Sequence, residues 1–319
     1  MRSVRVIDAT LREGCQAPGV RFSATQSVEI ALALSELGVD MIECGHPAIS
    51  EEEAQRVRCV ATLGLESPVL THARAHRGDI LAAAEAGASW VGIFLGVNEV
   101  TRRTRVPNRS VEQLLQLVDE SVRYARQCGL RVRYTVEDAS RTDYASMLLA
   151  FRTALSAGAD RVCFADTVGV LEPKDVATRI ASLRGDLPSA EIEVHLHDDR
   201  GLALANALAA VDAGANWVST SVNGLGERAG ITDLCLLLAN VHYRGQRELV
   251  SGSALRRISA RVAEYSGTVV DDRRPVIGRH AFTHTARLHV KAVLQDEEAY
   301  NWVPPEVFGA RTSISQEAG

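Results

Sequence analysis

The sequence predicts an α/β fold, a (β/α)8 TIM barrel with a small helical C-terminal extension. Short runs of β-branched residues alternate with Ala- and Leu-rich stretches eight times within about 245 residues, which is the number and size of the units in such a barrel. The alternation then stops, and residues 246–319 contain no further strand–helix unit. We therefore expect a catalytic barrel over residues 1–245 and a helical extension over residues 246–319, packed beside the barrel mouth or reaching to a second subunit.

The individual elements follow from composition and from glycine positions. The expected strands are Val4–Thr10, Met41–Gly45, Pro68–His72, Trp90–Gly96, Arg131–Val136, Arg161–Ala165, Glu191–His197 and Trp217–Val222. Helical stretches include Thr25–Leu37, Glu51–Leu63, Val111–Cys128, Asp143–Ala157, Pro173–Leu183, Ala203–Ala213 and Ile231–Tyr243, with Ser253–Tyr265 and His284–Val293 in the extension. Glycine follows several of these stretches, as expected just after a helix end. An open doubly wound sheet would have fewer strands and a glycine-rich turn after the first one, which this sequence lacks.

Composition limits the class of protein. The chain has 319 residues, 46% of them hydrophobic, and a net charge of −5 at pH 7. It can fill a sizeable core, and it has no dense run of Lys and Arg that would indicate a nucleic-acid partner. No apolar run approaches the length of a membrane span, and no secretory leader precedes the first strand, so we expect a cytoplasmic protein without membrane contact. The six cysteines are scattered and predict neither disulfides nor a zinc knuckle.

The seventh expected strand contains two histidines, His195 and His197. Because side chains alternate along a strand, both imidazoles face the same side and can bind one metal ion. Such a pair can also be a hydrogen-bonded pair in a protein core. Acidic residues follow at once, and Gly201 with an Ala-rich helix then marks the end of the strand, where barrel enzymes have their active sites. This position favours the metal site.

Polar residues gather at the carboxyl ends of six of the eight expected strands. Besides the two histidines, they include Arg12, Glu13 and Gln16 after the first strand, His72 in the third, Arg133, Thr135 and Glu137 in the fifth, Thr167 after the sixth, and Glu227 and Arg228 after the eighth. Each of them alone could be a helix cap or a surface ion pair. Together they indicate one active site at the barrel mouth.

Three motifs in this order carry a family resemblance. They are Asp8-x-Thr10-Leu11-Arg12-Glu13-Gly14-x-Gln16, His195-x-His197-Asp198-Asp199-x-Gly201 and Gly224-x-Gly226-Glu227-Arg228-Ala229-Gly230. The chain resembles the metal-dependent barrels that include homocitrate synthase, 2-isopropylmalate synthase and 3-hydroxy-3-methylglutaryl-CoA lyase. Leu70-Thr71-His72, Val132-Arg133-Tyr134-Thr135-Val136-Glu137-Asp138, Ala165-Asp166-Thr167-Val168-Gly169 and the segment from Ala281 to Ala292 are most similar to the homocitrate synthase branch.

The resemblance implies an acyltransferase that catalyses a Claisen-type condensation. Acetyl-CoA loses a methyl proton, the carbanion adds to the ketone of a 2-oxo acid, and hydrolysis of the thioester releases CoA. A divalent metal ion (Zn, Mn, Co or Mg) would bind the oxo acid and polarise its ketone. By resemblance, its ligands are Glu13, His195 and His197, and Arg12 stabilises the developing oxyanion.

The resemblance also assigns the remaining roles. Glu137, His289 and Tyr300 match the positions that remove the methyl proton. His289 and Tyr300 often come from the neighbouring subunit in this family, which implies a homodimer. Arg12, Gln16, His72, Arg133, Thr135 and Thr167 would bind the oxo acid, and Gly224, Gly226, Glu227 and Arg228 would bind CoA.

The substrate is less closely defined. The cationic pair His72 and Arg133 suits a second acidic group, as in 2-oxoglutarate, which would give homocitrate. Oxaloacetate or phosphonopyruvate would satisfy the same charges, and Arg133 could instead form a salt bridge with Glu137 or Asp138.

The sequence departs from the family pattern at Cys15, Asp198 and Arg287, where Glu, Asn and Gly are usual, and Leu225 replaces an Asn of the isopropylmalate branch. The chain also ends before the further segment of its relatives, so no regulatory domain is expected.

Two other functions stay open. A lyase that cleaves a CoA thioester would carry a Cys in the loop after the last strand, and Gly224–Gly230 has none. An inactive metal-binding barrel that serves as a partner for a full-length homologue would have no need of Glu137, His289 and Tyr300.

Overall fold

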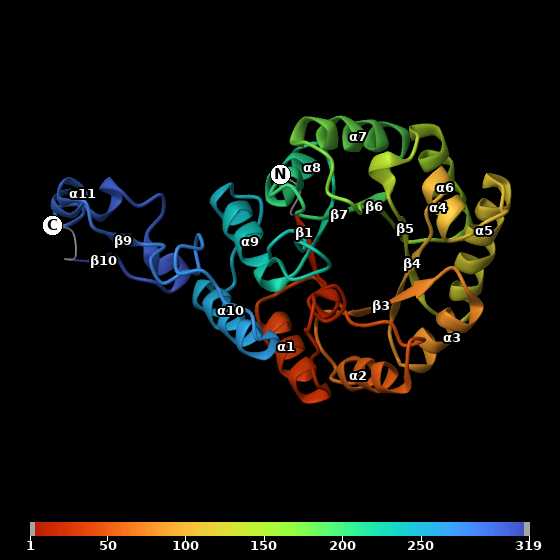
Figure 1. The fold of residues 1–319 in the computed structure, drawn as a ribbon, viewed down its shortest axis with the longest axis horizontal. Helices are drawn as coiled ribbons and strands as arrows, with labels where there is room; N and C mark the ends of the chain where they lie inside the picture. The colour runs from red at the N-terminus through yellow and green to blue at the C-terminus, as the bar shows by residue number, and fades with distance from the viewer. Residues whose placement is uncertain (1–3, 316–319) are drawn as a thin grey trace.

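A closed barrel of eight parallel strands forms the centre of the protein (Figure 1). The computed structural model describes residues 4–315. The strands are β1 (Arg5–Asp8), β2 (Met41–Glu43), β3 (Val69–Arg74), β4 (Trp90–Phe94), β5 (Arg131–Val136), β6 (Arg161–Asp166), β7 (Glu191–Leu196) and β8 (Trp217–Thr220). Each strand pairs with its neighbour in the sequence, and β8 closes the barrel by pairing with β1. The predicted TIM barrel is confirmed.

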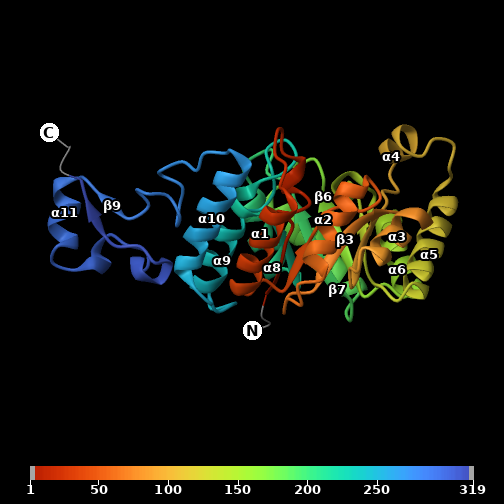
Figure 2. The same ribbon diagram turned by 90° about the horizontal axis from the view of Figure 1, so that it is seen from below.

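Helices surround the barrel. They are α1 (Ala24–Glu36), α2 (Glu51–Ala61), α3 (Arg77–Glu85), α4 (Glu99–Thr104), α5 (Val111–Gln127), α6 (Tyr144–Ala157), α7 (Pro173–Asp186), α8 (Ala203–Asp212) and α9 (Leu234–Tyr243). The short helices α3 and α4 are additional to the stretches named from the sequence. Side-chain caps define several of the starts: the Ser110 hydroxyl accepts from the Gln113 N–H, and the Gln113 side chain accepts from the Ser110 N–H. Helix α4 stands clear of the other barrel helices (Figure 2).

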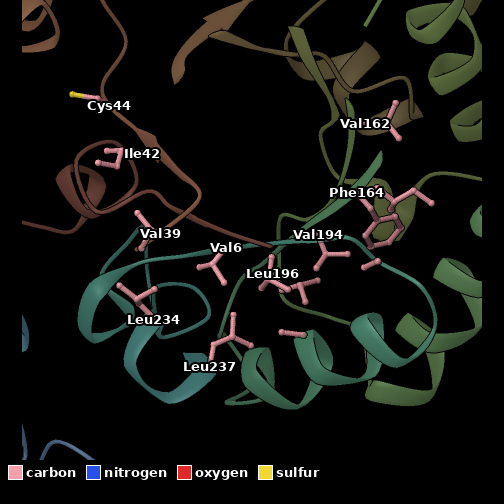
Figure 3. Close-up of a cluster of buried hydrophobic side chains, with 14 of the residues drawn as sticks. Val6, Val39, Ile42, Cys44, Val162, Phe164, Val194, Leu196, Leu234 and Leu237 are labelled. Atoms are coloured by element: carbon pink, nitrogen blue, oxygen red, sulfur yellow. The ribbon is translucent and has the colours of Figure 1, made fainter. Parts of the chain in front are cut away.

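Alternate side chains of each strand face either the surrounding helices or the interior of the barrel. In β7, Val194 and Leu196 belong to the apolar layer between strands and helices, which also contains Leu234 and Leu237 of α9 (Figure 3). Burying each such side chain contributes about 1.5–3 kcal/mol to folding. The alternate residue His195 therefore points into the barrel.

The amino-terminal end of the barrel interior is filled by an apolar cluster of Ile7, Met41, Leu70, Trp90 and Trp217. The Arg161 guanidinium lies among these residues, with its carbon 3.9 Å from the Trp217 ring centroid and 5.0 Å from that of Trp90. These side chains fill the amino-terminal part of the interior. Polar groups can therefore meet a substrate only at the carboxyl ends of the strands.

The segment after the barrel has two parts. Helix α10 (Gly252–Ser266) packs against α1 and against η3 (Val222–Gly224). Beyond it lie β9 (Thr283–His284), α11 (Arg287–Val293), η4 (Glu297–Ala299), η5 (Pro305–Phe308) and β10 (Ser313–Ile314), on the far side of α10 from the barrel (Figure 1).

The expected start of the last helix at His284 is wrong. His284 belongs to β9, which pairs with β10 in a small parallel sheet, and the helix begins at Arg287. Within residues 4–315, none of the helices has the length and apolar character needed to cross a membrane.

Candidate active site and metal centre

Three predicted metal ligands meet at the carboxyl end of the barrel. Glu13 directly precedes η1 (Gly14–Gln16), the turn after β1, and His195 and His197 lie at and just after the end of β7. One potential ligand atom from each residue lies within 4.8 Å of the others. The three side chains are buried, which shields a bound ion from bulk water.

The protonation states of these residues suit a divalent ion. Burial alone would raise the pKa of the Glu13 carboxyl, but the charge of Arg12, together with the neighbouring imidazoles and the Glu227 N–H, outweighs it and lowers the pKa to about 2. Burial lowers the pKa of both imidazoles, that of His195 well below its usual range. An anionic carboxylate and two neutral imidazoles are therefore available at pH 7, as metal binding requires.

Hydrogen bonding around the imidazoles also fits a metal site. His195 Nδ1 lies 2.9 Å from Ser219 Oγ, and this partner orients the ring. His197 Nδ1 is buried and has no hydrogen-bond partner among the described residues. A buried imidazole with an orphaned ring nitrogen, clustered with a carboxylate and a second imidazole, is the kind of group that a metal ion satisfies, so the donor set fits Zn, Mn, Co or Mg.

Glu43 is a central residue that the sequence reasoning missed. It ends β2, is fully buried, and its Oε1 accepts hydrogen bonds from Arg12 Nε at 3.1 Å and Arg133 Nη2 at 3.0 Å. His72 Nδ1 lies 2.9 Å from the same oxygen. The only signal in the sequence is a single acid within the apolar run Met41–Cys44. Glu43 thus joins two cations and an imidazole in one network.

Arg133 is held by carboxylates other than those considered from the sequence. Its Nη1 donates to Glu193 Oε1 at 3.0 Å and to Glu43 Oε2 at 3.1 Å. A salt bridge with Glu137 or Asp138 is therefore not what the structure shows. The close approach depends on Gly92, where an added Cβ would lie 2.5 Å from Arg133 Nη2.

A cavity of about 290 Å³ brings most of the candidate residues together. Its lining includes Arg12, Glu13, Gln16, His72, Arg133, Thr135, Glu137, Thr167, His195, His197, Glu227 and Arg228. His72 stacks on Phe94 with 4.4 Å between ring centroids, and burial lowers its pKa to about 4, so it is neutral at pH 7. Thr135 Oγ1 is buried and has no nitrogen or oxygen partner among the described residues, whereas Thr167 Oγ1 accepts from the Asp138 N–H.

Glu137 follows β5 at the rim of this cavity. Burial raises the pKa of its carboxyl, and an ion pair with Arg105 opposes that rise. Arg105 caps the carboxyl end of α4. It is a second residue that the sequence reasoning did not single out, because an arginine in a polar loop gives no sign of the residue it will contact.

The glycine-rich loop after β8 supports the metal ligands. The Glu227 N–H donates to Glu13 Oε1 at 3.0 Å, and a Cβ at Gly226 would lie 2.9 Å from Glu13 Cγ. Arg228 donates to Asp199 at 2.7 Å. Gly224 and Gly226 line a neighbouring hollow of about 300 Å³, to which Arg228 also contributes.

Two predicted catalytic residues lie elsewhere in this chain. His289 of α11 and Tyr300 stack on each other with 3.9 Å between ring centroids, and Tyr300 is 44% exposed. They belong to the extension beyond α10 and are not among the residues that line the active-site cavity (Figure 1). One chain alone therefore does not bring them to Glu137.

Comparisons with known proteins identify the family of this chain. The HMGL-like family model matches residues 3–262, and the model "Homocitrate synthase post-HMGL domain-like" matches residues 276–318. Homocitrate synthase of Saccharolobus solfataricus is 43% identical over 97% of this chain and 68% of its own length. Homocitrate synthase of Sulfurisphaera tokodaii is 42% identical over 96% of this chain and 67% of its own length.

Solved structures support the fold. An HMG-CoA lyase of Bacillus subtilis superimposes with a TM-score of 0.75 at 19% identity, covering 85% of this chain and 96% of the lyase. The carboxyl transferase domain of Rhizobium etli pyruvate carboxylase gives 0.68 at 18% identity, covering 83% of this chain and 48% of that one. Identity this low shows a shared barrel, whereas the homocitrate synthases match almost the whole chain at more than twice that identity. The chain therefore belongs to the homocitrate synthase branch of the HMGL-like family.

Proposed function

We propose that this protein condenses acetyl-CoA with 2-oxoglutarate and releases homocitrate and CoA. As a member of the homocitrate synthase family, it is an acyl-CoA:2-oxo acid acyltransferase, and the proposal adds the identity of the two substrates. The observation that carries the proposal is a single cavity lined by the Glu13, His195 and His197 cluster, by arginines and by Glu137.

The oxo acid would bind at the metal ligands. A divalent ion held by Glu13, His195 and His197 would bind the ketone and carboxylate oxygens of the oxo acid and polarise the ketone. Arg12 is fixed beside this position by Glu13 and Glu43, so its guanidinium would stabilise the negative charge that develops on the ketone oxygen.

The distal carboxylate of 2-oxoglutarate would lie between β3, β5 and β6. Arg133, whose charge is shared with Glu43 and Glu193, lines the wall there, and His72, Thr135 and Thr167 supply hydrogen-bonding groups. The Thr135 hydroxyl lies beside the Cys163 thiol and has no nitrogen or oxygen partner among residues 4–315, so its oxygen can accept a hydrogen bond from a ligand. This arrangement favours a diacid over a branched alkyl oxo acid, because unpaired polar groups in the wall penalise an apolar side chain.

Glu137 would remove the methyl proton of acetyl-CoA. It lies at the rim of the cavity, and burial raises its pKa toward the range in which a carboxylate is an effective base. His289 and Tyr300 of a second subunit in a homodimer would assist it, since their position in this chain leaves them exposed and beyond α10.

The test is release of free thiol from acetyl-CoA with 2-oxoglutarate, oxaloacetate, 2-oxoisovalerate, pyruvate and phosphonopyruvate, each with and without a chelator. We expect chelator-sensitive release with 2-oxoglutarate, and a loss of about a hundredfold or more in Glu137→Gln. Glu120→Gln, an exposed change on α5, is the control and should keep full activity. If thiol release is greatest with oxaloacetate or phosphonopyruvate, that acid replaces 2-oxoglutarate as the proposed substrate. If a folded, metal-loaded sample releases no thiol with any of the five acids, the proposed condensation is wrong, and the lyase or the inactive partner barrel is the better hypothesis.

A further inference from the structure

The segment from Asn98 to Ser110 forms a positively charged surface beside the active site. It contains Arg102, Arg103, Arg105 and Arg109 and a single acid, Glu99, in a chain whose net charge is −5. Arg102, Arg103 and Arg109 line a hollow of about 600 Å³ together with Glu99, Asn108 and Ser110. The structure records no ion pair for these three arginines within residues 4–315, and Arg102 Nε donates to the Arg109 carbonyl at 3.1 Å. Their charges are therefore available to an anionic ligand.

A second cavity is lined both by this segment and by the candidate base. It has a volume of about 270 Å³, and its walls combine apolar residues such as Leu95, Val106 and Leu117 with the polar Arg74, His76 and Thr101. Arg105 and Glu137 also line it, and both line the active-site cavity as well. The ion pair of Arg105 with Glu137 thus lies at the boundary between the two cavities.

The glycine-rich loop Gly224–Gly230, which the family resemblance assigns to CoA, has fewer unpaired positive charges than the segment from Asn98 to Ser110. Its hollow contains Arg228 and Arg274. Arg228 is paired with Asp199 at 2.7 Å, and Arg274 with Asp233. A phosphate bound there would have to compete with a carboxylate already in place.

We propose that acyl-CoA enters from the α4 side, with its pantetheine arm in this second cavity and its phosphates on Arg102, Arg103 and Arg109. This inference rests on the proposed function, because it assigns a site to one substrate of that reaction. The pantetheine arm has both methylene and amide groups, which match walls that contain both apolar and polar side chains, and guanidinium groups bind phosphates through paired hydrogen bonds. Helix α4 has six residues and is about 9 Å long, shorter than an extended pantetheine arm, so the phosphates and the reacting methyl group can span it.

The geometry also gives Arg105 a part in substrate entry. Its guanidinium lies 5.2 Å from the Phe94 ring centroid and pairs with Glu137. This ion pair occupies the Glu137 oxygen Oε1, so its separation would free that oxygen for the thioester methyl. The arm of acyl-CoA, passing between the two cavities, would displace Arg105 and leave Glu137 free to accept the proton.

The first test is steady-state kinetics of the full-length double variant Arg103→Ser/Arg109→Ser. Both side chains are exposed, so folding should be unaffected. We expect the KM for acetyl-CoA to rise about tenfold or more, with a much smaller change in kcat and in the KM for the oxo acid. Arg152→Ser/Arg261→Ser removes the same charge from α6 and α10 and is the matched control. With acetylpantetheine, which lacks the phosphates and the adenosine of CoA, the variant and the wild type should be equal.

A KM for acetyl-CoA equal to that of the control, or the same loss with acetylpantetheine, would overturn the proposed site. Calorimetric titration with CoA then separates this site from the proposed function, since binding needs no turnover. If the wild type turns over no oxo acid but CoA binding still depends on Arg103 and Arg109, the proposed condensation is wrong and the proposed CoA site is supported. If turnover is normal and CoA binding is unchanged in the variant, the proposed CoA site is wrong and the proposed condensation is supported.

Discussion

Asp8 is a buried acid whose protonation affects stability. It ends β1, and its Oδ1 accepts from the Thr10 N–H at 2.9 Å, while Oδ2 has no partner among residues 4–315. Burial raises its pKa to about 7. Because the pKa in the unfolded chain is about 3.9, the folded protein holds this proton more tightly. Its contribution to stability is therefore complete below about pH 4 and is lost as the pH rises through 7.

Asp8→Asn should remove this pH dependence. Relative to the wild type, we expect the free energy of unfolding of the variant to increase from pH 5 to pH 8 by at most about 2.7 kcal/mol, the equivalent of the two pH units between pH 5 and the folded-state pKa of about 7. Urea unfolding at both pH values measures it. Asp119→Asn on the surface helix α5 is the control and should keep the wild-type profile. An Asp8→Asn profile parallel to that of the wild type would contradict the assignment.

The sequence could predict which side chains of a single strand lie on the same face. It could not predict which side chains from different strands contact each other across the barrel. His195 and His197 were found because the period of a strand fixes the face to which they point. Glu43 and Arg105 escaped because their partners, Arg133 and Glu137, lie 90 and 32 positions away. The same limit explains the incorrect suggestion for Arg133: a single sequence does not show which neighbouring strand supplies a carboxylate.

The loop after β8 fixes a metal ligand through its backbone. The Glu227 N–H holds Glu13 Oε1, and the loop closes where the Ile231 N–H donates to the Gly224 carbonyl at 3.1 Å. Gly230 has a φ of +85°, and a Cβ there would lie 1.7 Å from the Gly224 oxygen. No side chain fits without moving the loop.

Gly230→Ala should therefore lower metal affinity. Displacing the Glu227 N–H removes the partner that orients Glu13, and we expect a loss of about 10–100-fold in affinity, measured by titration with Zn in competition with a chromophoric chelator. Gly245→Ala is the matched control, because its φ is +64° but its Cβ would meet open space. Equal affinities in the two variants would show that the loop does not support the metal site.

At the scale of the molecule, sequence patterns predicted the barrel better than the extension. Eight repeated units with apolar strands specify a closed barrel with little ambiguity. The part of the extension beyond α10 has short elements, and some of its apolar side chains are exposed: Leu288 and Leu294 are 70% and 71% exposed. Local patterns could therefore indicate a helix such as α11 but not where it lies.

In a homodimer, the extension of each subunit would complete the active site of its partner. This arrangement would explain both the exposed apolar residues of the extension and the position of His289 outside the cavity of its own chain. The exposed Leu288, Leu294, Tyr300 and Trp302 would then be covered by the second barrel. Each active site would combine Glu137 of one chain with His289 of the other. This arrangement makes a quantitative prediction for mixed dimers.

Glu137→Gln and His289→Ala should each be nearly inactive alone and should restore activity when co-expressed. Half of the dimers would be mixed, and each mixed dimer would hold one intact site, so roughly a quarter of wild-type thiol release is expected. The mixed dimers can be isolated with two different affinity tags, and they should then show about half of the wild-type rate. If His289 served the Glu137 of its own chain, both sites of every mixed dimer would carry one defect, and co-expression would restore nothing.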